Sequence, residues 1–223
     1  MSTAAPPLGF RLARWMMRAG VPGGFRLQEA MRRGGLLARP AVYDLGGGVE
    51  FEVPVGRREN SWDAADLARY DPPLIEGMLR AAQAMPAPPV LVDAGADIGT
   101  VSAQTVAGGA KLARILAYEP NAAAFAVLSR NLARLDIPAE ARRAGVGSQA
   151  GHGALRQPDF SGNAHSAFVG SGDPTRLRWL LDLRPWSFEV LDVPAVVPDP
   201  DRPFFAQIEN PRPIGYNVLA LTL

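Results

Sequence analysis

Short apolar segments alternate with helical patterns between residues 89 and 147, and this alternation constrains the fold more than any other feature of the sequence. The apolar runs and the helical periods between them are 90–95, 99–110, 114–120, 122–135 and 138–147. Strands separated by helices of this length pair in parallel, with right-handed crossovers. The pattern therefore predicts an α/β fold with a doubly wound, mostly parallel sheet.

Three regions are expected along the chain. Residues 1–40 form a basic helical arm, residues 41–88 a hairpin followed by a helix, and residues 89–223 the α/β domain. The hairpin is indicated by apolar alternation on both sides of the glycines at 46–48. The helix is expected within 59–85, because its apolar positions share one side: Leu74, Met78, Leu79 and Ala82.

The pattern weakens after Gly147. Residues 148–174 are rich in glycine, serine and polar side chains, which indicates mostly loop. We expect a short helix at 176–186, a strand or two within 187–197 and a buried parallel strand at 203–210. Only about four core strands are then found, so the α/β domain is expected to be shortened at its C-terminal end.

The arm carries arginines and no acidic residue before Glu29. Phe10, Ala13, Trp15, Met16 and Met17 are predicted to share one helical face. Such a face suits packing on its own domain or on a partner subunit in a homo-oligomer. It also suits an organelle-targeting segment or peripheral contact with a membrane surface. No apolar run approaches the roughly 18 residues that span a bilayer, so no transmembrane segment is expected.

The composition of the chain argues against several classes of function. A net charge of +1 gives no reason to expect nucleic-acid binding. The chain has no cysteine and only His152 and His165 as histidines, so disulfides and thiolate sites are excluded and no metal site is expected. The lack of cysteine also fits a reducing compartment, and we expect the protein in the cytoplasm.

The segment LVDAGADIG at 91–99 is the strongest indication of a ligand. In open α/β sheets, ligands bind at the carboxyl ends of the strands, where Gly95 and Gly99 allow a close approach to the backbone. A tight turn without a ligand is the alternative. Dinucleotides usually require Gly-x-Gly-x-x-Gly, with an acid about 20 residues further on. Glu119 satisfies the second condition, but the glycine spacing does not satisfy the first.

The acidic residues favour a different ligand. Asp93 and Asp97 would repel a pyrophosphate, whereas S-adenosylmethionine carries positive charges and no phosphate. Glu119 follows the second strand in AYEPN and offers two acceptors for two ribose hydroxyls. Asn121 is a candidate for nucleoside contact, or the N-cap of the next helix.

VDAGADIGTVSAQ, LAYEPNAAAFAVLSRNL and ARRAGVGSQAG together resemble the FkbM-type S-adenosylmethionine-dependent methyltransferases, and the resemblance covers about residues 42–220. It implies a Rossmann-like class I methyltransferase fold and methylation of hydroxyl oxygens on saccharides or natural products. By this resemblance the donor-binding residues are Asp93, Gly95, Ala96, Gly99, Glu119, Gly147 and Ser148.

The segment QIENPRPIG departs from the family pattern, because Gln207 and Glu209 stand where a lysine and an aspartate are usual. Glu209 and His165 are the candidate catalytic bases for removing the hydroxyl proton. A locally bonded loop histidine is the alternative for His165. Trp62, Tyr70 and Trp186 could form a sugar-binding wall or belong to the core.

The expected function is therefore that of an O-methyltransferase with a saccharide or natural-product acceptor. The alternatives are a non-catalytic binding or interaction protein of methyltransferase type, and a nicotinamide-dependent dehydrogenase.

Overall fold

The computed structural model describes residues 4–57 and 62–145, and the backbone of short strands at 154–156, 167–169, 186–190 and 218–222. Its helices are α1 (Leu8–Arg18), α2 (Gly24–Arg33), α3 (Ala64–Leu67), α4 (Pro72–Ala84), α5 (Thr100–Ala107) and α6 (Ala122–Leu132). The strands up to residue 145 are β1 (Ala41–Asp44), β2 (Glu50–Val53), β3 (Val90–Ala94), β4 (Arg114–Tyr118) and β5 (Ala139–Arg142).

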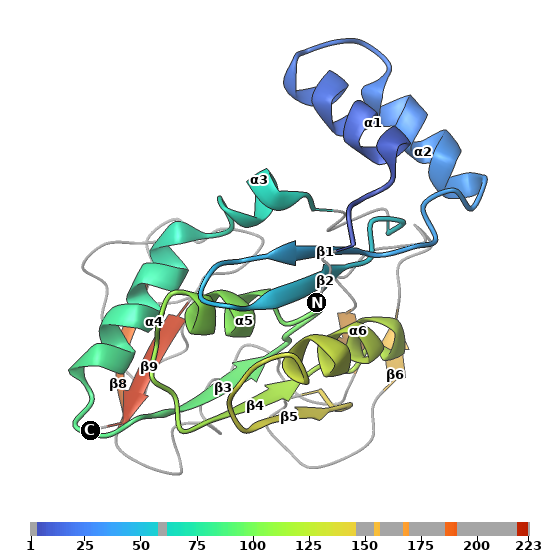
Figure 1. Ribbon diagram of the computed structural model, residues 1–223. Helices are drawn as coiled ribbons and strands as arrows, with labels where there is room; N and C mark the ends of the chain where they lie inside the picture. Colours follow the sequence, from blue (N-terminus) through green and yellow to red (C-terminus); the bar gives the residue numbers. More distant parts are fainter. Residues whose placement is uncertain are drawn as a thin grey trace.

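A parallel sheet in the order β3-β4-β5 forms the centre of the described structure (Figure 1). Leu91 pairs with Ile115, and Ile115 pairs with Ala139. α5 connects β3 to β4, and α6 connects β4 to β5. Each of these elements falls within the segment predicted for it, so the mixed α/β architecture of this region is confirmed.

The two faces of this sheet differ in burial. Leu91, Ile115 and Ala117 are buried on the face that belongs to the core, because alternate side chains of a strand point to one side. On the other face, Val90 and Val92 are 51% and 47% exposed. A doubly wound sheet has both faces covered. The described residues show one covered face, and double winding stays a prediction.

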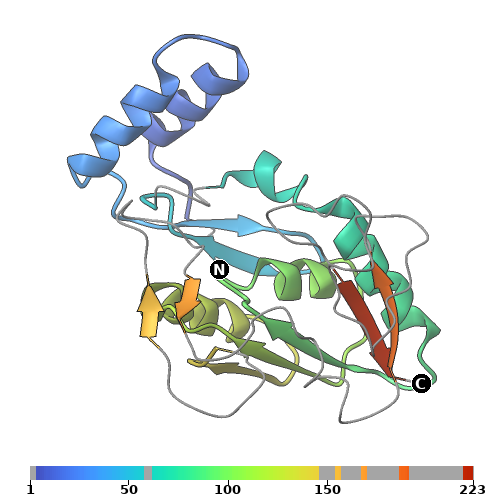
Figure 2. The same cartoon turned by 180° about the vertical axis from the view of Figure 1, so that it is seen from behind.

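The predicted hairpin is present as the antiparallel pair β1-β2, in which Tyr43 lies opposite Phe51. β2 contacts α6, and α6 contacts β5. Figures 1 and 2 show the hairpin on the far side of α5 and α6 from the parallel sheet. The helices therefore form a middle layer between two sheets.

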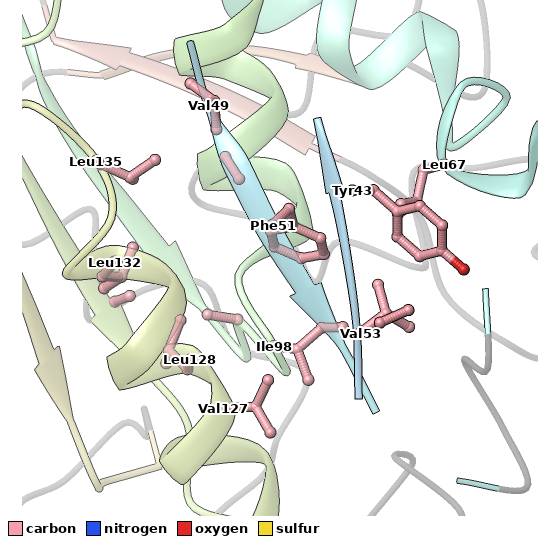
Figure 3. Packing of buried hydrophobic residues seen from close by; sticks show 14 of the residues in the cluster. Tyr43, Val49, Phe51, Val53, Leu67, Ile98, Val127, Leu128, Leu132 and Leu135 are labelled. Atoms are coloured by element: carbon pink, nitrogen blue, oxygen red, sulfur yellow. The ribbon is translucent and has the colours of Figure 1, made fainter. Parts of the chain in front are cut away.

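The core lies between the hairpin and this helical layer. Phe51 of β2, Ile98 of the glycine turn and Leu128 of α6 are all completely buried. Their side chains approach one another in Figure 3, together with those of Val127 and Leu132. Apolar packing therefore joins the hairpin to the turn that follows β3.

A buried amide joins the same three elements by hydrogen bonds. The side chain of Asn131 in α6 accepts the backbone N–H of Glu52 at 2.7 Å and donates to the carbonyl of Glu52 at 3.0 Å. It also donates to the carbonyl of Ile98 at 2.9 Å. Asn131 is only 1% exposed, so its amide substitutes for water at backbone groups that are otherwise unpaired.

The N-terminal arm is a pair of helices, α1 and α2, that pack on each other. Phe10 and Ala13 are buried, as the packing interpretation of this face expects, whereas Trp15 is 59% exposed. Including Trp15 in the packed face was therefore wrong. Trp15 lies five residues after Phe10, about 140° further around the helix. No helix in the described ranges is long and apolar enough to cross a membrane.

The helix expected within 59–85 is divided into α3 and α4. Asp71 is the N-cap residue of α4 and accepts the backbone N–H of Leu74, and Pro72 occupies the first helical position. Proline suits that position because it has no N–H to leave unpaired. The predicted apolar side of this helix is partly buried, and Gly77 and Ala81 lie deepest.

The described C-terminal strands form two antiparallel pairs. β6 (Ala154–Arg156) pairs with β7 (Ala167–Val169), in a region predicted as mostly loop. β8 (Trp186–Val190) falls largely within the predicted strand region and pairs with β9 (Val218–Thr222). The helix at 176–186 lies outside the described residues except for Trp186, which begins β8, and the strand at 203–210 lies outside them entirely.

Replacing Asn131 by leucine should lower the free energy of unfolding by about 3 kcal/mol, because two backbone carbonyls and one N–H would stay buried without partners. Chemical denaturation measures the change. Gln83→Leu on the exposed side of α4 is the matched control and should stay within about 0.5 kcal/mol of the unmodified protein. Equal effects of the two substitutions would contradict this role of Asn131.

Candidate functional site

Two segments with candidate ligand-binding residues meet at the carboxyl ends of β3 and β4. The glycine turn 95–99 follows β3, and Glu119 follows β4 directly. Because the two strands are parallel neighbours, with Ala94 opposite Tyr118, both segments leave the sheet at the same edge. This edge is where open α/β sheets bind ligands.

The backbone of the turn is satisfied largely by the protein itself. The carbonyl of Tyr118 accepts the N–H of Gly95 at 2.9 Å and that of Ala96 at 3.0 Å. The N–H of Gly99 donates to the carbonyl of Ala96 at 2.7 Å. Asp97 has a φ of 48°, a left-handed conformation that aspartate tolerates better than most residues. These contacts fix the turn and occupy the N–H groups of Gly95, Ala96 and Gly99.

The carboxylate of Glu119 is held between the two segments. One oxygen accepts the backbone N–H of Asp97 at 2.9 Å, and the other accepts that of Asn121 at 2.7 Å. Each oxygen keeps a second lone pair for another donor. Burial raises the pKa of Glu119 above its ordinary value, and these two backbone N–H groups oppose the rise. The side chain is thus preoriented and still able to accept further bonds.

The two aspartates have partners within the protein, so they are not two unopposed negative charges. Both terminal nitrogens of Arg57 donate to one oxygen of Asp97 at 3.0 Å. Asp93 accepts the hydroxyl of Ser102 in α5 at 2.6 Å. Burial raises the pKa of Asp93, against the opposing effect of Ser102. The charge argument made from the sequence is therefore weaker at Asp97, where an arginine offsets the carboxylate.

The two glycines of the turn have different surroundings. A Cβ at Gly99 would lie 2.9 Å from a methyl carbon of Leu128, so this glycine allows α5 to approach α6 closely. A Cβ at Gly95 would meet nothing within 4 Å. Both have positive φ, at 88° and 79°. Gly95 therefore leaves open space beside the turn, and Gly99 serves packing.

Asn121 acts as the N-cap of α6. Its side-chain oxygen accepts the N–H groups of Ala123 at 2.9 Å and Ala124 at 3.2 Å, and the residue is buried. Of the two interpretations of Asn121 from the sequence, the structure supports the N-cap. Its backbone N–H still contributes to the site, because it donates to Glu119.

Two of the three candidate wall residues, Trp62 and Tyr70, lie together, and Trp62 packs against the hydrophobic core, as the core alternative expects. The rings of Trp62 and Tyr70 have centroids 5.1 Å apart and are tilted by 57°. Burial raises the pKa of Tyr70 to about 12, and the charges of Asp93 and Asp97 add to this rise. Tyr70 is therefore near enough to the glycine turn to feel its carboxylates.

His165, Glu209, Gly147 and Ser148 lie outside the described residues, as does the side chain of Trp186. The described part of the site therefore comprises the turn after β3, the end of β4 and the neighbouring aromatic pair.

Sequence reasoning missed Arg57 and Ser102. Arg57 is 40 residues from Asp97 in the chain, in the segment after the hairpin, and no local pattern indicates that contact. Ser102 lies in the first turn of α5, nine residues after Asp93, and an inward polar residue at that position could have been a signal.

Comparison with known proteins gives no relative for this chain: no protein-family model, no curated protein and no solved structure matches it.

Proposed function

We propose that this protein is an S-adenosylmethionine-dependent O-methyltransferase that acts on a hydroxyl of a saccharide or natural product in the cytoplasm. The observation that carries the proposal is that backbone N–H groups of the glycine turn already donate hydrogen bonds within the protein. The N–H groups of Gly95, Ala96 and Asp97 all donate to acceptors at the end of β4. At these three positions the site therefore offers the carboxylate of Glu119 and no free N–H group.

This arrangement favours a nucleoside without phosphates. A pyrophosphate is normally bound by backbone N–H groups at the start of the helix that follows the first strand. Here Asp93 occupies that place with a carboxylate that accepts the hydroxyl of Ser102, in the first turn of α5. An added phosphate would meet the negative charge of Asp93 there, and this mismatch supports S-adenosylmethionine over a dinucleotide.

The residues present fit the methyl donor. The remaining lone pairs of Glu119 suit two ribose hydroxyls, and the open side of Gly95 leaves room beside the turn. S-adenosylmethionine, when bound, supplies a methyl group attached to a positively charged sulfur. The sulfur keeps the electrons of the carbon–sulfur bond as that bond breaks and the new carbon–oxygen bond forms. The protein has to orient the acceptor hydroxyl and receive its proton.

The acceptor side of the proposal depends on aromatic surface and on a base. Trp62 and Tyr70 lie together near the turn, and paired rings are suited to contact with the apolar face of a sugar. Tyr70 would donate a hydrogen bond and would not serve as the base, because tyrosine is protonated at neutral pH and burial raises its pKa further, to about 12. His165 and Glu209 remain the proposed bases.

One observation favours the dinucleotide as a second candidate. Arg57 lies beside Asp97, and its guanidinium could turn toward a phosphate at the cost of that ion pair. Titration calorimetry with S-adenosylmethionine and with NAD separates the two candidates. We expect binding of the methyl donor and none of NAD at the same concentration. Binding of NAD alone would overturn the proposal.

A turnover assay tests catalysis separately from binding. Transfer of a labelled methyl group to a panel of sugars and hydroxylated natural products is expected. Binding of the donor without transfer to any acceptor, in a folded protein, would instead support a non-catalytic protein of methyltransferase type.

Replacing Gly95 by alanine should weaken binding of the methyl donor by about tenfold or more, because the added methyl group points into the open side of the turn. Gly109→Ala is the matched control, since Gly109 has a φ of 88° and an equally open surrounding but lies after α5. Both substitutions should cost about 1 kcal/mol of stability from strain at positive φ. Equal donor affinity in the two variants would contradict a ligand at Gly95.

Binding of the donor should weaken as the pH falls toward the raised pKa of Glu119. An ordinary glutamate protonates near 4.5, whereas burial makes Glu119 protonate at higher pH. A protonated carboxyl group accepts fewer hydrogen bonds, so affinity drops by up to about tenfold per pH unit below that pKa. Glu119→Gln should lower affinity about 10- to 100-fold at neutral pH and flatten the pH profile. Glu76→Gln, on the exposed side of α4, should change neither.

A further inference from the structure

The helix pair α1 and α2, with the residues that connect and follow the two helices, carries most of the exposed large apolar side chains in the described ranges. They are Leu8, Leu12, Trp15, Val21, Phe25 and Leu36, whereas the parallel sheet contributes Val90 and Val92. Figures 1 and 2 show this helix pair standing away from the rest of the protein, so its outer side is accessible. A concentration of exposed apolar groups on one projecting element indicates an interaction surface.

The exposed groups of α1 form one stripe. Leu8, Leu12 and Trp15 follow the spacing i, i+4, i+7 and lie within about 60° of one another around the helix. Phe10 and Ala13 are completely buried and lie roughly 140–200° from Leu8. The helix thus has a packed apolar side and, opposite it, a second apolar side that no described residue covers. We name Leu8, Leu12 and Trp15 the outer stripe.

α1 is fixed to the body of the protein through its packed side and its basic residues. Arg14 and Arg18 form ion pairs with Asp63 and Asp66 at the start of α3. Phe10 belongs to the same buried cluster as Leu37 of the linker to β1. These contacts hold the orientation of α1, so the outer stripe faces away from the body.

The charge around the outer stripe is positive. Arg11 lies one turn from both Leu8 and Trp15, and Arg26 follows Phe25 in α2; both are exposed. Neither forms an ion pair within the described ranges. No acidic residue precedes Glu29, which itself is bound by Arg32 and Arg33. A partner for this surface therefore has to offer both an apolar region that can bury the outer stripe and negative charge beside it.

A second copy of the chain suits these requirements poorly. A two-fold contact through the outer stripe would bring the same patch of each copy together, including Arg11 of both. The patch contains no carboxylate to compensate them. A membrane containing acidic lipids provides an apolar interior for leucine and tryptophan and phosphates for arginine.

We propose that the α1–α2 pair is a peripheral docking surface for anionic membranes. The outer stripe enters the boundary between headgroups and acyl chains, and Arg11 and Arg26 contact lipid phosphates. Trp15 sits at the level of the headgroups, where its indole ring has both polar and apolar neighbours. This inference is independent of the proposed methyl transfer, because it uses no residue of the candidate site.

Co-sedimentation of the full chain with vesicles tests the proposal. Vesicles of phosphatidylcholine with roughly one third phosphatidylglycerol, which gives the surface a negative potential, are compared with pure phosphatidylcholine. We expect binding to the mixed vesicles that weakens in high salt, and little binding to the neutral ones. A blue shift of tryptophan fluorescence should accompany binding to the mixed vesicles. The shift should disappear in the Trp15→Phe variant, although this variant keeps an apolar ring and should keep most of the affinity.

Variants separate the apolar and charged contributions. Leu12→Glu with Trp15→Glu should abolish vesicle binding, and circular dichroism shows whether the helices persist, because neither side chain belongs to the packed side. Arg11→Gln should weaken binding about fivefold, as expected for one basic residue near an acidic surface. Arg69→Gln, an equally exposed arginine after α3, is the matched control and should leave binding unchanged.

Two results would overturn the proposal. One is equal vesicle binding by the unmodified chain and by the double glutamate variant. The other is a dimer in solution that the double variant dissociates, with no vesicle binding by the unmodified chain, since a second copy would then cover the outer stripe.

Discussion

The buried amide of Asn131 is the interaction on which the arrangement of the described structure depends. It binds both backbone groups of Glu52 in β2 and the carbonyl of Ile98 in the glycine turn, while its own residue belongs to α6. The hairpin, the helix and the turn therefore cannot shift independently without breaking buried hydrogen bonds. Arg130 of α6 also forms an ion pair with the side chain of Glu52 in β2. The position of the candidate site follows from this junction, because the turn emerges directly from it.

The chemistry of the site depends on which groups accept the hydrogen bonds of the glycine turn. Tyr118 and Glu119, at the end of β4, accept the N–H groups of Gly95, Ala96 and Asp97. The same contacts make the turn rigid and orient the carboxylate of Glu119. The rigidity of the turn and the orientation of Glu119 therefore have one physical origin. The proposal of a phosphate-free nucleoside ligand depends on this coupling more than on the charge of the aspartates.

Much of the described region could be predicted from sequence, and the reasons for the exceptions are physical. Every strand and helix between residues 90 and 142 was expected, because hydrophobic periodicity is a local property of the chain. Trp15 was assigned to the wrong side of its helix because both sides of α1 are apolar and periodicity alone does not tell which one packs. The partners of Asp97 and Asp93 were not foreseen, and the charge argument built on these residues was weakened for that reason. Arg57 in particular reaches Asp97 only because the segment after the hairpin folds back onto the turn.

The sequence by itself determined the alternation of strands and helices, the glycine turn and the acidic residue at the end of the next strand. Each of these depends on residues within one short segment and on the period of the backbone. Only the tertiary structure decided that Glu119 is held by the amides of Asp97 and Asn121, that Gly95 faces open space and Gly99 a leucine, and that Asn131 joins three elements. These contacts involve segments far apart in the chain, and their geometry arises only when the core has packed.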